Sequence, residues 1–268
     1  MAVMPEQIPD VEGPDFLDDA SDSPERPRPL TGYPRDLGER DVELDERPAA
    51  RQPIPSVLRT LRVTLGAPET QQRVLIDRAP QGGRRAAVLA LFDTRPPAPR
   101  LLFVEKSAHL RRHAGQIAFP GGSWAEGDEG PVGTAQREAG EEAAVRPDSF
   151  RVLGVLPTAH VSASGFDVAT VVAWWHTPHP VEVNDPGEIA ALHQIEVRRL
   201  VDPANRATVR YPGGRRGPAF LIDDLFIWGL TAHLVDALID LAGWTVPWDH
   251  DRIRPVPLRF GRDHDPAR

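Results

Sequence analysis

The chain has 268 residues, 40% of them hydrophobic and 26% charged, which suffices for one sizeable core but not for a large multidomain assembly. It contains no cysteine, so disulfide scaffolds, cysteine nucleophiles and cysteine-ligated metals are excluded, and a metal site must use oxygen or imidazole ligands. The net charge of −8 is concentrated in residues 1–50, which hold 14 acids and 5 arginines, so the remainder lacks the basic surface that nucleic-acid or membrane binding requires.

The two ends of the chain differ in composition from its body. Eight prolines, dense acids and few aliphatic residues predict a disordered, acidic, proline-rich extension over residues 1–50. We assign the folded domain to residues 51–248 and expect a loose polar tail over 249–268. No apolar run approaches the roughly 20 residues that span a bilayer, so we expect a cytoplasmic protein with neither membrane nor nucleic-acid partners.

The first half of the domain alternates short strands with two helices. Apolar spacing predicts a helix over 55–65 that docks through Val57, Leu58, Leu61 and Leu65. Strands over 86–92 and 100–106 flank a proline-rich loop and form a hairpin. A short strand over 116–119 ends at Pro120, Gly121 and Gly122, and a helix follows over 132–145.

The second half predicts more strands and one long helix. Strands are expected over 150–156 and 166–175, and the pattern over 187–202 supports no assignment. A hairpin joins 207–211 to 218–223. Apolar residues at helical spacing then predict a helix over 224–243, with Ile227, Leu230, Leu234, Leu238 and Leu241 on its buried side.

Three glutamates share one face of the predicted helix over 132–145. Glu138, Glu141 and Glu142 stand at positions i, i+3 and i+4, where like charges repel one another. A cation among them would remove that repulsion, and hard carboxylate oxygens suit Mg²⁺ or Mn²⁺. The alternative interpretation is an ordinary acidic surface helix in which Arg137 pairs with Glu141.

The glutamates lie in a segment that resembles the Nudix box, G-x5-E-x7-R-E-U-x-E-E-x-G-U, where U is a bulky aliphatic residue. The matching residues are Gly122, Arg137, Glu138, Glu141, Glu142 and Val145. Asp128 stands at the first glutamate position, with eight residues instead of seven before Arg137; aligning Glu129 restores the seven but lengthens the preceding spacer. Ala139 is small for U, and Ala144 replaces a glycine that would serve a positive-φ helix end, so we expect that turn to be strained or built differently.

A second motif directly upstream narrows the resemblance. Residues 102–122 are similar to the signature L-L-T-x-R-[SA]-x3-R-x3-G-x3-F-P-G-G of the coenzyme A pyrophosphatase branch of the Nudix superfamily. The matching residues are Ser107, Arg111, Gly115, Phe119, Pro120, Gly121 and Gly122. Lys106 replaces the usual arginine, which keeps the charge but gives up the planar fork. An aspartate in the loop is familiar in that branch, which favours alignment through Asp128.

The resemblance implies an α/β protein, the Nudix α/β/α sandwich with a mixed β-sheet, acting as a monomer or homodimer. It implies a Mg²⁺- or Mn²⁺-dependent diphosphatase that converts coenzyme A to 4′-phosphopantetheine and adenosine 3′,5′-bisphosphate. The implied metal ligands are Glu138, Glu141 and Glu142; Arg137 joins them as a catalytic-site residue that pairs with the loop acid, and substrate contacts fall to Lys106, Arg111, His113, Gly121 and Gly122. The general base remains open between this cluster and Glu188.

Two alternative functions remain. A Nudix hydrolase could act on another nucleotide, such as ADP-ribose or a nucleoside triphosphate. A degenerate Nudix domain could bind a nucleotide without turnover, as the replacement at Ala144 and the irregular loop would suggest. Likewise, Arg111 and His113 could bind substrate or merely brace their loop.

Overall fold

The structure is a computed structural model that describes residues 52–67, 70, 81–162, 164–211, 214–257 and 260. The predicted extension over 1–50 lies outside the described residues. The elements in chain order are η2 (Ser56–Leu58), α1 (Arg59–Leu65), β1 (Arg84–Asp93), β2 (Arg100–Lys106), β3 (Ile117–Ala118), β4 (Gly121–Ser123), α3 (Gly130–Ala143), η3 (Pro147–Ser149), β5 (Arg151–Val161), β6 (Phe166–Trp174), β7 (Ile189–Glu196), α4 (Val197–Val201), η4 (Pro203–Asn205), β8 (Arg206–Arg210), β9 (Arg216–Ile222), β10 (Leu225–Ile227), α5 (Gly229–Leu241) and β11 (Ile253–Arg254). No described helix is long and apolar enough to cross a membrane.

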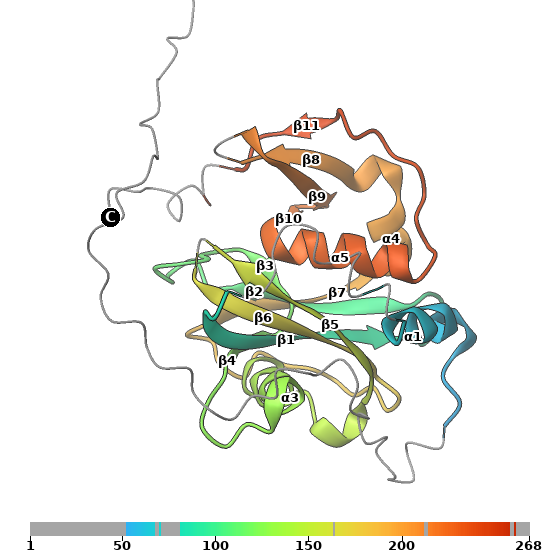
Figure 1. The fold of residues 1–268 in the computed structure, drawn as a ribbon, viewed down its shortest axis with the longest axis vertical. Helices are drawn as coiled ribbons and strands as arrows, with labels where there is room; N and C mark the ends of the chain where they lie inside the picture. The colour runs from blue at the N-terminus through green and yellow to red at the C-terminus, as the bar shows by residue number, and fades with distance from the viewer. Residues whose placement is uncertain are drawn as a thin grey trace, which may run out of the picture. The chain divides into compact units, whose positions relative to one another are not determined.

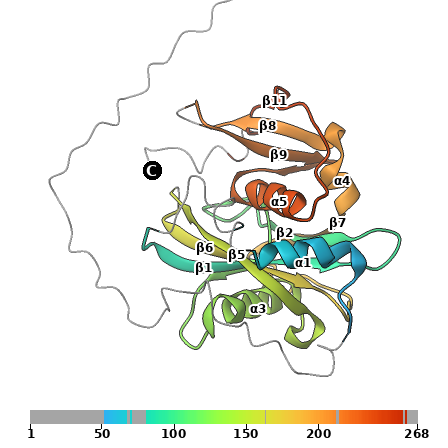
Figure 2. The same cartoon turned by 45° about the vertical axis from the view of Figure 1, so that its right-hand side comes forward.

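A mixed seven-stranded sheet forms the centre of the fold. Its main path runs β3-β2-β1-β6-β5, with β4 also pairing β1 and β7 also pairing β2. Strands β1 and β6 are parallel, in a ladder from Arg84↔Phe166 to Phe92↔Trp174, and the other pairs are antiparallel. Helix α3 covers one face, and α1 and α5 cover the other (Figures 1 and 2). The predicted α/β/α sandwich with a mixed sheet is therefore confirmed.

Small side chains bring α3 close to the sheet. Ala135, Ala139 and Ala143 are fully buried at helical spacing and pack with residues of β1, β2 and β6, including Ala87 and Ala169. Helix α3 contacts β1, β4 and β6. Ala139, small for its position in the box, is thus part of a layer built from alanines.

Larger side chains fill the opposite face. Phe92, Phe103 and Phe119 are buried there with leucines from α1 and α5. The predicted docking of residues 55–65 is confirmed, because Leu58 and Leu61 have no exposed surface, although the first turn is the 3-10 helix η2.

A second sheet, β10-β9-β8-β11, lies beyond α5 (Figures 1 and 2). The predicted hairpin of β8 and β9 is confirmed, with register from Arg206↔Phe220 to Arg210↔Arg216. The predicted helix over 224–243 is wrong in its first turn. Leu225–Ile227 pairs with β9, and the helix starts at Gly229, whose φ of +65° interrupts the strand-to-helix path.

Two further segments differ from expectation. The expected loose tail after Trp248 contributes β11, which pairs parallel with β8, and Thr208 N–H donates to the Arg252 carbonyl at 2.9 Å. Residues 187–202, left unassigned from sequence, form β7 and α4, and β7 pairs along the whole of β2. The pairing of β7 with β2 places Glu188 beside the end of β2.

Candidate active site

Helix α3 lies directly against the backbone of the turn that follows β3. Gly122 lies in β4, opposite Ala87 of β1, and a Cβ built on it would lie 2.5 Å from the carboxylate atoms of Glu138. Such a separation is impossible for real atoms, so the position of Glu138 requires glycine at 122. The glutamate therefore rests directly on the strand.

Gly121 and Lys106 hold the second glutamate of α3. Glu142 is buried, with its side chain 3% exposed. One carboxylate oxygen, Oε2, accepts the Gly121 N–H at 3.0 Å, and the other, Oε1, lies 2.6 Å from Lys106 Nζ. Both oxygens of a buried charge are thereby satisfied.

Lys106 also reaches a carboxylate outside α3. Its Nζ lies 2.6 Å from Glu188 Oε1, so the ammonium bridges Glu188 and Glu142. The approach is fixed by the backbone, since Ser107 N–H donates to the Glu188 carbonyl at 2.7 Å. The structure thus brings together two carboxylates that are 46 positions apart in the sequence numbering.

Burial and neighbouring charges shift the pKa of Glu138, Glu142 and Lys106. Burial raises the pKa of Glu138 and of Glu142, and the negative charge of Glu188 adds to both shifts, whereas Arg137 and Lys106 oppose them. Burial alone would lower the pKa of Lys106, but the charges of Glu142 and Glu188 outweigh it and raise the pKa overall. The cluster is therefore a group of interacting charges that are partly removed from solvent.

Arg137 fixes the loop before α3. Its Nε donates to Asp128 Oδ1 at 2.9 Å, and its NH2 group donates to the Ser123 carbonyl at 2.8 Å. The hydrogen bonds from Arg137 lower the pKa of Asp128 to about 2, with help from Ala125 N–H and Thr134. Asp128, rather than Glu129, is the loop acid that pairs with the arginine.

Arg137 also joins its neighbours on α3. Its NH1 group lies 2.9 Å from Glu138 Oε1 and 3.0 Å from Glu141 Oε2, and Glu141 is 58% exposed. The pair expected of an ordinary surface helix is therefore present at Glu141. The half-buried Glu138 and the buried Glu142 do not fit that interpretation, because solvated helix faces leave their carboxylates in water.

The helix ends in a left-handed residue without glycine. Ala144 has φ 53° and ψ 29°, and its N–H bonds to the Gly140 carbonyl at 3.1 Å while Val145 N–H bonds to Ala139 at 3.1 Å. The helix therefore ends in the expected positive-φ conformation, which is strained because the residue that adopts it is an alanine.

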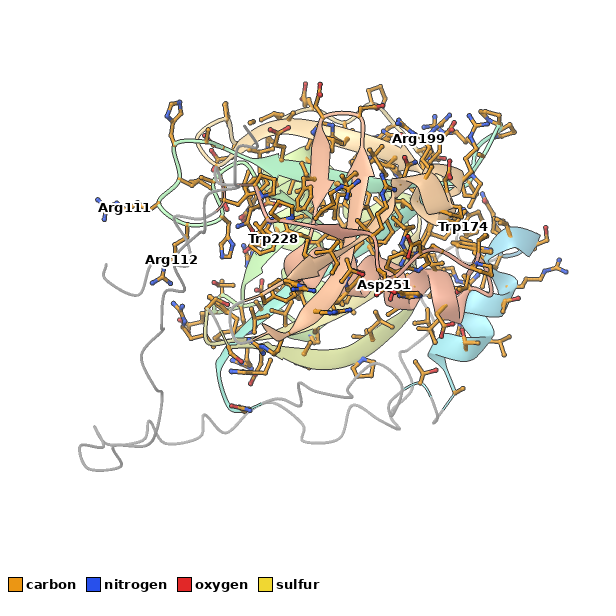
Figure 3. All side chains as sticks on the ribbon, turned by 90° about the horizontal axis from the view of Figure 1, so that it is seen from above. Arg111, Arg112, Trp174, Arg199, Trp228 and Asp251 are labelled. Atoms are coloured by element: carbon orange, nitrogen blue, oxygen red, sulfur yellow. The ribbon has the colours of Figure 1, made fainter. Side chains whose placement is uncertain are left out.

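The predicted substrate-binding cations separate into two groups. Lys106 lies among the carboxylates, as described above. Arg111 and His113 lie on the exposed segment between β2 and β3, where Arg111 projects away from the body of the domain (Figure 3) and His113 Nδ1 lies 3.1 Å from Gln116 Oε1. Gly122 leaves room for the carboxylate of Glu138, whereas a Cβ on Gly121 would collide with Ala87 and Val88 of β1. The substrate contacts expected of the two glycines stay predictions.

One positioning residue was missed. Asn184 N–H donates to the Glu142 carbonyl at 3.2 Å, and its side-chain amide donates to the Gly140 carbonyl at 3.3 Å, which ties the loop before β7 to the end of α3. The asparagine sits in a loop without a motif, so no pattern in the sequence indicated it.

The donor set fits a hard divalent cation in its chemistry. Glu138, Glu142 and Glu188 supply carboxylate oxygens whose mutual repulsion a cation would relieve. Within the described part of the chain, however, no three carboxylate or imidazole groups are arranged to hold a metal ion. Lys106 Nζ lies where two of these carboxylates meet and supplies the compensating charge.

Known proteins share this chain's sequence pattern. Residues 83–212 match the protein family described as the NUDIX domain. The chain is 34% identical over 171 residues to a Shigella flexneri protein named "Uncharacterized Nudix hydrolase NudL", covering 62% of this chain and 86% of that relative. A Pectobacterium atrosepticum protein of the same name is 39% identical over 162 residues, covering 58% and 81%. A solved Nudix hydrolase from M. smegmatis, RenU, is 20% identical with a TM-score of 0.45, covering 62% of this chain and 90% of that one.

Proposed function

The chain belongs to the Nudix hydrolase family, and from this premise we propose that it cleaves the diphosphate linkage of coenzyme A or of its oxidised or acylated derivatives. The products would be adenosine 3′,5′-bisphosphate and 4′-phosphopantetheine or its derivative. The observation that carries the proposal is the gathering of Glu138, Glu142 and Glu188 beside the Gly121–Gly122 turn.

The arrangement suits attack of water on a diphosphate. Such a linkage is inert because its negative oxygens repel a nucleophile. Glu138 and Glu142, together with Glu141 or Glu188, would hold Mg²⁺ or Mn²⁺, which would neutralise those oxygens and promote attack by water.

The chain's own groups would divide the remaining tasks. Glu188 is 47% exposed and comes from a different segment than the α3 glutamates, so it suits the role of proton acceptor for the attacking water. Arg137 would orient Glu138 and hold the loop through Asp128, as a positioning residue.

Recognition of coenzyme A is the finer part of the proposal. Coenzyme A carries a 3′-phosphate besides its diphosphate, and charge-assisted hydrogen bonds from the exposed Arg111 and His113 would bind it. The resemblance of residues 102–122 to the coenzyme A pyrophosphatase signature supports this choice of substrate.

The test is chromatographic product analysis with coenzyme A and with ADP-ribose, each in the presence of Mg²⁺. We expect adenosine 3′,5′-bisphosphate from coenzyme A, and a loss of about 100-fold or more in rate for Glu142→Gln, which keeps the shape but removes the charge. Cleavage of ADP-ribose alone would keep the chemistry and overturn the choice of substrate. Absence of product from either would favour a binding domain without turnover.

A further inference from the structure

Lys106 is the only lysine of the chain, and the fold places its ammonium between two carboxylates of the cluster. Its side chain is 12% exposed, and its Nζ lies 2.6 Å from an oxygen of Glu142 and 2.6 Å from an oxygen of Glu188. These two ion pairs are short enough for charge-assisted hydrogen bonds. The ammonium therefore does for these two carboxylates what a metal ion would do.

The backbone of Lys106 is held independently of this side chain. Its N–H donates to the Gln116 carbonyl at 2.9 Å, and its carbonyl accepts the Gly115 N–H at 3.0 Å. The four-carbon side chain can therefore leave the carboxylates by rotation alone, without disturbing β2. Lysine suits such an exchange better than arginine, because its point charge has no planar fork to disengage from two oxygens at once.

We propose that Lys106 is a built-in cation that holds Glu142 and Glu188 together while the site has no metal, and that a divalent metal ion must displace it from Glu142. The proposal rests on the proposed metal-dependent function. It makes Lys106 a positioning residue and a competitor of the metal, which differs from the substrate contact expected from the sequence. Displacement would free Glu142 to bind the ion and Glu188 to accept a proton.

The first experiment measures Mn²⁺ binding by calorimetry, without substrate and at pH 8. We expect Lys106→Met to bind Mn²⁺ at least tenfold more tightly than the wild type, because no ion pairs have to be broken. Lys106→Arg keeps the charge and adds a planar fork, so it should bind Mn²⁺ no more tightly than the wild type does. Arg112→Met, which removes an exposed cation six residues along the chain, controls for net charge and should bind as the wild type does.

The possible outcomes test the role of Lys106 separately from the proposed function on which it rests. Equal or weaker binding by Lys106→Met, with clear binding by the wild type, would overturn the competition and leave the proposed function standing. Lack of Mn²⁺ binding by every variant at millimolar concentrations would overturn both. Should Lys106→Met not fold without metal, recovery of its thermal transition on adding Mn²⁺, larger than the shift in the wild type, supports the inference.

A second experiment uses the unmodified protein. An amine-reactive ester has two targets in the chain, Lys106 and the terminal amine, and the terminal amine serves as the internal reference. Mass spectrometry of the labelled peptides should show Lys106 labelled several-fold faster with Mn²⁺ than without, while the terminal amine is unaffected. Unchanged or slower labelling of Lys106 would contradict its displacement.

Discussion

The helices that cover the two faces of the central sheet bring different kinds of side chain to it. On the α3 side, alanines of the helix meet alanines, aliphatic side chains and the buried Trp175, and carboxylates reach the backbone of β4. On the other side, phenylalanine, tryptophan and leucine side chains from the sheet, α1 and α5 fill a large apolar core. One face brings the main chains close together to hold charges, and the other separates them to bury volume.

The difference teaches where stability and chemistry reside. A layer of large apolar groups contributes most of the free energy of folding, since burial scales with apolar area. A layer of small groups buries less, but it lets a charged side chain be positioned within a fraction of an ångström by strand backbone. Mutations on the two faces should therefore separate stability from activity.

The largest expected effect is on the apolar face. Phe92→Ala empties a fully buried site in β1, where the ring also meets Trp244 edge-on at 5.9 Å. We expect the free energy of unfolding to fall by about 4 kcal/mol, measured by denaturant titration. The rate per folded molecule at low temperature should stay within about threefold of the wild type; a larger loss would show that the faces are not independent.

The second-largest effect is on the α3 face, where we expect activity to fall and stability to stay nearly unchanged. Gly122→Ala forces the flexible carboxylate of Glu138 away from the strand, because the added methyl group would lie 2.5 Å from it. We expect the catalytic rate to fall about 100-fold, equivalent to about 2.7 kcal/mol, with a thermal transition near that of the wild type. Gly66→Ala, whose added Cβ meets nothing closer than 3.6 Å, is the control and should keep full activity. A Gly122→Ala enzyme with normal rate would show that the position of Glu138 is unimportant.

A smaller effect concerns the loop acid and depends on pH. The pKa of Asp128 is about 2, lowered from 3.8, so its ion pair with Arg137 stabilises the folded state above about pH 4 and is lost as the pH falls from 4 towards 2. Asp128→Asn should lower the free energy of unfolding at pH 7 by about 1–2 kcal/mol, and the gap to the wild type should narrow in acid. Denaturant titrations at pH 7, 4 and 3 measure it, with the exposed Asp148→Asn as control; a gap that widens in acid would contradict the assignment.

The smallest expected effect is a gain in stability. Ala144→Gly relieves the left-handed conformation at the end of α3, where φ is 53°, without removing a buried side chain of any size. We expect the free energy of unfolding to rise by about 1 kcal/mol, seen as a higher melting temperature. Unchanged activity would show that the turn only closes the helix, whereas a destabilised variant would mean that the methyl group contributes packing that outweighs the strain.

Features that depend on residues close together in the sequence were predicted from periodicity and motifs. The helix over 132–145, the hairpin of β1 and β2 and the pairing of Arg137 with the loop acid follow from local patterns. The alanine in place of a glycine at 144 predicted a turn that is strained or built differently, and the structure has the strained form, with Ala144 in the left-handed region. These features depend on neighbours in sequence.

What was missed depends on distant partners. Strand β7 has no clear alternation because it is defined by its pairing with β2, and β11 exists because β8 offers an open edge. The location of Lys106 follows from the same cause. The resemblance implied a substrate contact for Lys106, but the pairing of β2 with β7 brings Glu188 to it and makes it a counter-ion of Glu188 and Glu142.

The parallel ladder of β1 and β6 also governs how the molecule is made. Its paired residues lie about 80 positions apart in the chain, so a long loop must close before the central hydrogen bonds can form, and such topologies fold slowly. Helix α3 and the glycine turn belong to the enclosed stretch, and α3 packs on both strands of the ladder. Assembly of the carboxylate cluster therefore depends on this long-range pairing as well as on the local glycine turn.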